Sequence, residues 1–276
     1  MLYFVRRLTQ RKLCCQPRLL HFRRGFHHTH SKGSLTQFAQ GRDLQYWSET
    51  VETERINDML KYYGVRKWGF IVYRCTYDDD SAWDRFMHHL NARKDASLID
   101  TYDDELLAQS LDWNVQQDPS LDHATTDQVR GRFKAWVATN ARAEMPISPD
   151  QQHKLQGLLY ENPRYKYCIR VDAEAMKSVL DGPPPAEPDL RAISYVHLIR
   201  ADQAWDVWEE ECALATQIEH DPRNEGEPEI EGRTSSDVGW MKVSVDGLVP
   251  EVYELLVRDQ MWDVFYVRPN EGVCQR

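Results

Sequence analysis

RYKYCIRVDAEAMKSVLDGPPPAEPDLRAISYVHLIRAD (residues 164–202) is the stretch that decides the fold class. RYKYCIRVD alternates apolar and polar residues as a strand does, and DAEAMKSVL follows as a short helix capped by its aspartate. DGPPPAEPD breaks the helix, and AISYVHLIRAD is again typical of a strand. The stretch therefore predicts a β-α-β unit.

A second unit of the same kind follows after an insertion. GWMKVSVDG (239–247) is typical of a strand, VPEVYELLVRD (249–259) of a helix with proline in its first turn, and MWDVFYVRP (261–269) of a closing strand. Two β-α-β units in series match the split βαβ, or ferredoxin-like, motif. With the strand KWGFIVYRCTY (67–77) and the helix after it, we expect an α+β domain with a mixed or antiparallel sheet of about five strands and helical insertions.

The chain upstream of residue 164 is predicted to be mainly helical. Apolar residues at helical spacing and capping signals mark helices within 48–63, 80–90 and 124–141, the last opened by the capping box Thr125-x-x-Gln128. Trp83 and Phe86 mark the apolar face of the second helix, so we expect both to be buried. Residues 97–123 look irregular, and 146–163 looks like a polar connector with at most a short helix.

Composition favours a soluble globular protein, and the length is as compatible with one domain as with two. The 276 residues are 41% hydrophobic with a mean hydropathy of -0.67, and no apolar run approaches the roughly 20 residues of a membrane span. We assign residues 43–276 to a single α+β domain, with an acidic loop at about 219–237.

Residues 1–42 have a different composition. They hold nine of the 34 basic residues and none of the 44 acidic residues. Arginine-rich, acid-free sequence interleaved with leucine and phenylalanine is typical of a mitochondrial transit peptide, and Arg24-Gly25-Phe26 before His27 resembles a matrix cleavage site. We expect a mitochondrial matrix protein. The alternative is a disordered basic arm on a cytoplasmic protein.

The remainder of the chain has a net charge of -19, which repels phosphate backbones and argues against a nucleic-acid partner. Four cysteines outside the leader (Cys75, Cys168, Cys212, Cys274) are widely spaced, so neither a disulfide framework nor a metal site is predicted. No phosphate-binding glycine motif occurs, and no cofactor is predicted.

Several blocks of this sequence resemble the recurring blocks of an uncharacterised family of filamentous-fungal proteins. They are WGFIVYRCTY (68–77), LDWNVQQDPSLDHATTDQVRGRFKAWV (111–137), RYKYCIRVD and DVGWMKVSV (237–245). The blocks run over most of residues 50–270, so the resemblance implies one continuous domain. It implies no catalytic residue.

Four predicted strands each carry one basic residue. Side chains alternate along a strand, so Arg74 shares a face with Trp68, and Lys242 shares a face with Trp240. If the apolar sides of all strands face the same way, the other face carries the candidate ligand-binding residues, which are Arg74, Arg170, Arg200, Lys242, Trp68 and Trp240. His197 falls on the apolar side of its strand and is expected to be a hydrogen-bonded core histidine, with a general base as the alternative.

The aromatic residues on that basic face need a cover, because a face in contact with water would not gather them. Helical insertions, the second subunit of a homodimer, or a ligand would each supply one. Arginine recognises carboxylate and phosphate groups through two parallel hydrogen bonds, which favours a small anionic ligand. Ion pairs between these basic residues and nearby acidic side chains are the other interpretation.

No stretch carries a motif specific for one reaction, so the sequence does not decide whether the protein is an enzyme. The first hypothesis is a non-enzymatic module that binds a protein or a ligand. The alternative is a small-molecule enzyme in which a dimer encloses a basic, aromatic pocket on the open sheet face. If residues 97–160 plug that face, the first hypothesis is favoured; a concave cavity would favour the second.

Overall fold

A computed structural model describes residues 52–145, 152–215, 227–258 and 260–275. Residues 49–276 cluster as one compact unit. The leader (1–42), with its predicted transit peptide, and the first part of the acidic loop lie outside the described residues. No helix within the described ranges is long and apolar enough to cross a membrane.

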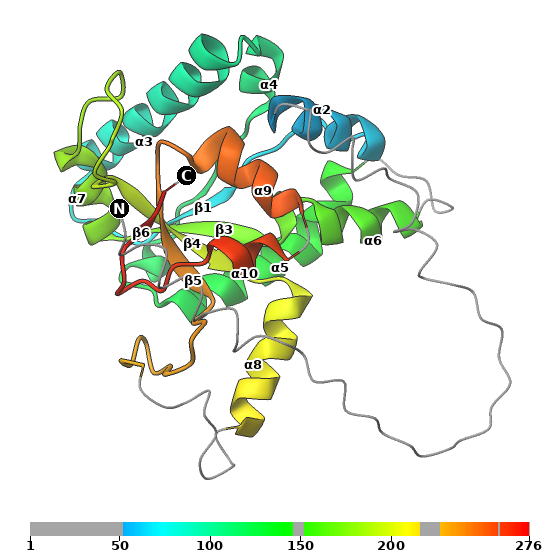
Figure 1. The fold of residues 1–276 in the computed structure, drawn as a ribbon, viewed down its shortest axis with the longest axis vertical. Helices are drawn as coiled ribbons and strands as arrows, with labels where there is room; N and C mark the ends of the chain where they lie inside the picture. The colour runs from blue at the N-terminus through cyan, green and yellow to red at the C-terminus, as the bar shows by residue number, and fades with distance from the viewer. Residues whose placement is uncertain (1–51, 146–151, 216–226, 259, 276) are drawn as a thin grey trace, which may run out of the picture. The chain divides into compact units, whose positions relative to one another are not determined.

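The described residues form one six-stranded mixed sheet in the order β2-β1-β3-β4-β5-β6 (Figure 1). β1 is parallel to both β2 and β3, β4 is antiparallel to its two neighbours, and β5 is parallel to β6. The strands are β1 (Ile71–Arg74), β2 (Asn114–Gln116), β3 (Tyr167–Val171), β4 (Tyr195–Arg200), β5 (Trp240–Ser244) and β6 (Val273–Cys274).

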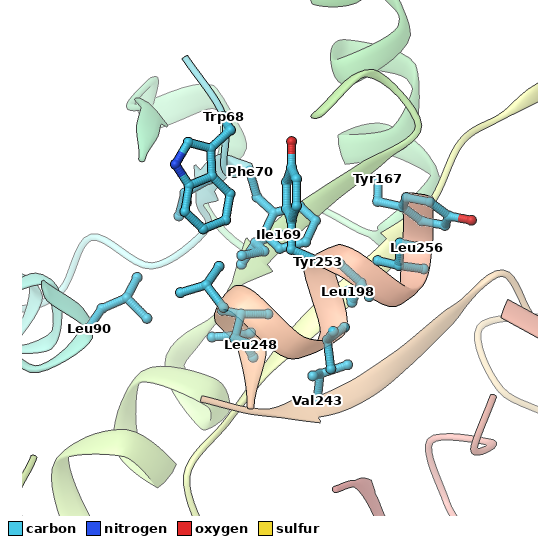
Figure 2. Packing of buried hydrophobic residues seen from close by; sticks show 14 of the residues in the cluster. Trp68, Phe70, Leu90, Tyr167, Ile169, Leu198, Val243, Leu248, Tyr253 and Leu256 are labelled. Carbon is cyan, nitrogen blue, oxygen red and sulfur yellow. The ribbon is translucent and has the colours of Figure 1, made fainter. Parts of the chain in front are cut away.

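One face of the sheet packs against α2 (Glu52–Tyr63), α3 (Asp80–Asp95), α7 (Ala173–Asp181) and α9 (Tyr253–Val257). The sheet contributes alternate residues of its central strands, among them Val72, Ile169, Leu198 and Val243. Figure 2 shows Tyr253 of α9 beside Trp68 and Phe70, with ring centroids 4.9 Å and 5.1 Å away. We call this side the α3 face.

The opposite face packs against α5 (Thr126–Glu144) and the turn before it, and we call it the α5 face. Val129 and Phe133 of α5 lie over Ile71, Cys168 and Ile199 of the sheet, and all five side chains are buried. α5 begins at the expected capping box, in which Thr125 accepts a hydrogen bond from the Gln128 backbone and the Gln128 side chain accepts one from the Thr125 backbone. Helices thus cover both faces.

The remaining elements lie around this core. They are α4 (Glu105–Ser110), α6 (Gln152–Glu161), α8 (Gln203–Ala215) and α10 (Met261–Phe265), together with π-helical turns at Ala96–Thr101 and Leu248–Val252 and 3-10 turns at Pro119–Leu121 and Pro163–Tyr165. α8 projects away from the sheet in Figure 1. The expected irregular segment 97–123 therefore holds a helix and the edge strand β2.

The predicted α+β class and mixed sheet are confirmed, with six strands in the described chain where about five were expected. The ferredoxin-like arrangement is not confirmed. A split βαβ unit places another strand between the two strands that its helix joins. Here β3 and β4, joined by α7, are antiparallel neighbours. MWDVFYVRP is not a strand, because residues 261–265 form α10 and the last strand is β6.

The helix boundaries follow local capping chemistry. The sequence offers Asp80 or Ser81 as the cap of α3. The cap is instead Asp79, whose carboxylate accepts a hydrogen bond from the Ala82 backbone. Trp83 and Phe86 are buried against the core, as the apolar spacing predicted.

Candidate functional site

The register of the sheet separates the predicted basic face into two halves. Arg74 is opposite Val171 and Arg200 is opposite Tyr167, which places both on the α3 face. Arg170 is opposite His197, and His197 is opposite Lys242, which places Arg170 and Lys242 on the α5 face. The prediction that all four basic side chains share one face is therefore wrong.

The open sheet face on which the enzyme hypothesis depends is also absent from the described domain. Helices of the same chain cover the α3 face and the α5 face alike. α5 lies within residues 97–160, the insertion expected to plug the face if the protein is a non-enzymatic module.

Each of the four basic residues has a carboxylate partner, as the ion-pair interpretation expects. Arg74 pairs with Asp80 at 2.5 Å, and Lys242 pairs with Glu174 at 3.1 Å. Arg170 contacts Asp172 at 3.1 Å and Glu231 at 3.3 Å, and Arg200 contacts Asp202 at 2.9 Å and Asp263 at 3.3 Å.

Trp68 and Arg200, two of the six predicted site residues, have structural roles and do not line the pocket described below. Trp68 is fully buried, and its indole donates a hydrogen bond to the Leu107 carbonyl at 2.8 Å. The guanidinium carbon of Arg200 lies 5.7 Å from the ring centroid of Trp262, and Arg200 has three carboxylate partners, Asp202, Asp237 and Asp263. Of the other four residues, Arg74 lines a pocket at the edge of the sheet, whereas Arg170, Lys242 and Trp240 lie together on the α5 face.

The first place is a hollow of about 460 Å³ at the carboxyl ends of β1 and β2, where α3 begins. We call it the carboxyl-edge pocket. Open sheets with parallel strands bind ligands outside the carboxyl ends of those strands, so this is the position at which a ligand site is expected. The pocket is lined by Arg74, Tyr77, Asp80, Trp83, Asp84, Gln117 and Pro119.

Arg74 is fixed in the wall of this pocket. Its guanidinium carbon lies 4.5 Å from the Tyr77 ring centroid and 5.1 Å from the Trp83 ring centroid, within cation–π distance. Its Nε donates to the Thr76 carbonyl at 2.8 Å and its Nη2 to Asp80. Two aromatic rings and two acceptor groups of the same chain therefore engage this guanidinium.

Tyr77 joins the two strand ends that frame the pocket. Its hydroxyl donates to the Arg74 carbonyl at 3.2 Å and accepts from the Asp118 backbone N–H at 2.8 Å. Burial raises the pKa of Tyr77, so its hydroxyl stays protonated. The Asp80 carboxylate is 84% exposed, and Asp84 is exposed beside it. Acidic groups therefore dominate the accessible surface of the pocket.

The second place is a line of polar residues that crosses the α5 face. Tyr73, Arg170, His197 and Lys242 occupy directly opposite positions on β1, β3, β4 and β5, and we call them the polar row. Trp240 lies next to it, with its ring centroid 4.8 Å from that of His197. Three predicted site residues, Arg170, Lys242 and Trp240, thus gather around a histidine that was expected to be structural.

His197 is 2% exposed, which confirms the expected burial, but its hydrogen bonding differs from the expectation. Neither ring nitrogen has a partner in hydrogen-bond geometry among the described residues. Nδ1 faces the Asp172 carboxylate at 3.5 Å, within ion-pair range only. Burial lowers the pKa of His197 to about 4, and Asp172 opposes that shift incompletely, so the imidazole is neutral at pH 7.

Glu174, Tyr195 and Lys242 close the polar row toward solvent. The Tyr195 hydroxyl and the Lys242 ammonium both donate to Oε1 of Glu174. The hydrogen bond from Tyr195 lowers the pKa of Glu174 and keeps it ionised. The Lys242 ammonium lies 4.6 Å from the Tyr195 ring centroid.

Sequence reasoning missed most of the carboxyl-edge pocket. Tyr77 and Asp80 belong to YDDD (77–80), an acidic stretch whose sequence indicates only a helix-capping turn, and Gln117 lies in a segment expected to be irregular. The proline and aspartates near residue 118 are turn signals and could have suggested a chain reversal at the pocket, but no local pattern shows that β2 pairs with β1.

Comparisons of the chain with protein-family models, with curated proteins and with solved structures find no match. The fold, the carboxyl-edge pocket and the polar row define the protein only as an α+β domain whose mixed sheet is covered on both faces. The resemblance to a fungal family stays a prediction.

Proposed function

We propose that this chain is a non-enzymatic ligand-binding module and that its ligand, a small molecule, binds in the carboxyl-edge pocket. The observation that carries the proposal is the hollow of about 460 Å³ at the carboxyl ends of the parallel strands β1 and β2. The hollow is open to solvent, its volume lies within the range of small-molecule sites, and aromatic, charged and amide side chains line it.

The charge of the pocket selects among small molecules. One guanidinium, already paired and covered by two rings, faces two exposed carboxylates, Asp80 and Asp84. A molecule with an ammonium group beside an apolar part complements this lining, because the carboxylates accept from the cation while the apolar part contacts Tyr77 and Pro119. The anionic ligand expected from the sequence would have to displace Asp80 from Arg74.

A thermal-shift screen of residues 49–276 tests the proposal. The panel contains primary amines and amino acids, together with the carboxylates and phosphates that the sequence favoured. We expect an amine or amino acid to raise the melting temperature, because a ligand that binds only the folded state stabilises it. A panel without effect would contradict the proposal, and stabilisation by phosphates alone would return the site to the anionic interpretation.

Two exposed substitutions separate this pocket from the rest of the surface. Asp84→Ala and Gln117→Ala remove lining groups without touching the buried core, so they should abolish the ligand-induced shift and leave the unliganded melting temperature unchanged. Glu229→Ala removes an exposed acid outside the pocket and is the matched control. A ligand response that survives both pocket variants would place the site elsewhere.

A further inference from the structure

The α5 face holds a concentration of buried polar atoms that have no hydrogen-bond partner among the described residues. Arg170 Nε, both ring nitrogens of His197 and Trp240 Nε1 belong to this set. They are close together, because Arg170 and His197 both contact Oδ2 of Asp172 and the Trp240 ring contacts His197. Such atoms are costly to bury unpaired, since each loses its bonds to water.

The rings around His197 restrict how a partner reaches it. The Tyr195 ring is stacked at 5.8 Å with an interplanar angle of 16°, and the Trp240 ring is tilted against His197 at 4.8 Å. A partner therefore reaches the imidazole along its edge, where the two nitrogens lie. Because Nδ1 faces the Asp172 carboxylate, the N–H belongs on Nδ1 and the lone pair on Nε2.

The unpaired groups then divide into donors and an acceptor. Arg170 Nε and Trp240 Nε1 are donors, and His197 Nε2 is an acceptor. The surrounding charges are two cations, Arg170 and Lys242, and three carboxylates, Asp172, Glu174 and Glu231. An added anion would meet this excess of negative charge in a desolvated place, which disfavours it.

We propose that Arg170, His197 and Trp240 form a buried site for a small uncharged molecule that carries both a hydrogen-bond acceptor and a donor, as a primary amide does. The carbonyl oxygen accepts from Arg170 and Trp240, and the amide N–H donates to His197 Nε2. Of the residues around the site, Lys242 and Glu174 are partly exposed, at 21% and 68% of their side chains. The site lies on the face opposite to Arg74 and does not depend on the carboxyl-edge pocket.

Acetamide is the probe for this site, with acetate and inorganic phosphate as charged counterparts. We expect acetamide to shift the ¹⁵N resonances of the His197 imidazole in a saturable manner in residues 49–276, and acetate and phosphate to leave them unchanged. No saturable shift would overturn the proposal, because the polar atoms would then be hydrated only. A larger ¹⁵N shift with acetate or phosphate than with acetamide would overturn the proposal that the ligand is uncharged.

Trp240→Phe removes one donor while keeping an aromatic ring, and it should weaken acetamide binding at least tenfold. Trp113→Phe is the matched control, because the Trp113 indole N–H is also buried and unpaired but lies outside this cluster. Equal weakening in both variants would overturn the assignment. If Trp240→Phe does not fold, the acetamide titration of the wild-type protein, followed by the ¹⁵N resonances of His197, decides alone. Asp84→Ala should leave acetamide binding unchanged, so the tests of this site and of the carboxyl-edge pocket are independent.

Discussion

His197 shows how burial decides the chemistry of a single residue. Its ordinary pKa of 6.5 falls to about 4 in the folded protein, mainly because the buried imidazole cannot be hydrated when charged. Between these two values the unfolded chain binds a proton that the folded chain does not. The free energy of unfolding therefore decreases as pH falls from 6.5 to 4, by about 3 kcal/mol at most.

Replacement of His197 by phenylalanine should remove this pH dependence while keeping a ring between Tyr195 and Trp240. The check is urea denaturation of both proteins at pH 7.0, 5.5 and 4.5, where the stability difference between wild type and variant should change in the variant's favour as the pH falls. His123→Gln is the control, because the His123 side chain is 76% exposed. Parallel curves for wild type and His197→Phe would show that another group controls acid stability.

Arg164 is the fully buried arginine that joins three segments. Its guanidinium donates two hydrogen bonds to Glu144, at 2.8 Å and 2.9 Å, and one to the Asp112 carboxylate at 2.7 Å. It also donates to the carbonyls of Gly69 and Asp112. These contacts connect the end of α5, the approach to β1 and the approach to β2.

Arg164→Met should lower the free energy of unfolding by about 3 to 5 kcal/mol, because it leaves two partly buried carboxylates without their partner. Arg132→Met, at a 59% exposed side chain, should change it by less than about 1 kcal/mol. Chemical denaturation gives both values. Equal effects of the two substitutions would mean that the buried network contributes nothing specific.

At the scale of elements, α3 is a helix whose buried face the apolar spacing of the sequence predicted. Phe86 is fully buried, and its ring stacks on that of Trp83 at a centroid distance of 5.3 Å. Phe86→Ala should lower the free energy of unfolding by about 3 to 5 kcal/mol, since it removes apolar contact and leaves a cavity. Arg85→Ala, on the exposed side of the same helix, should be near neutral in the same denaturation experiment.

The strands show which structural features the sequence could predict and which it could not. Alternation correctly grouped residues within each strand, so His197 does share a face with Tyr195 and Ile199. It could not match one strand with the next, because a shift of one residue in register reverses every side chain. Arg74 is opposite Val171 and not Arg170, and Arg200 is opposite Tyr167, so these two arginines lie on the other face of the sheet from Arg170.

Other errors have the same origin in long-range pairing. MWDVFYVRP is short and apolar, and such a run suits a strand or a buried helix equally until its neighbours are known. The carboxyl-edge pocket needs β2 beside β1, a pairing across about 40 residues that no local signal announces. Helix caps depend on adjacent residues alone, so Thr125 and Asp172 were predicted correctly.

At the scale of the whole molecule, charge divides the chain. Residues 1–42 carry nine basic and no acidic residues, whereas the remainder has a net charge of -19. A basic amphipathic segment is drawn through a membrane toward the negative side by the transmembrane potential, at about 2.3 kcal/mol per charge for each 100 mV. An acidic body has no such preference, so any mitochondrial address belongs to the leader.

A fluorescent reporter fused behind residues 1–40 should therefore accumulate in mitochondria, with dissipation of the membrane potential preventing its import. The matched control carries Arg6→Glu, Arg7→Glu, Arg11→Glu and Lys12→Glu, which keeps the length and every apolar residue but lowers the net charge of residues 1–40 from +8 to zero. This reporter should stay in the cytosol. A diffuse reporter with the native leader would contradict the mitochondrial address and leave the disordered basic arm. If both fusions reached mitochondria, potential-driven import of the basic leader would be contradicted as the mechanism, because a segment without net positive charge would be imported equally well.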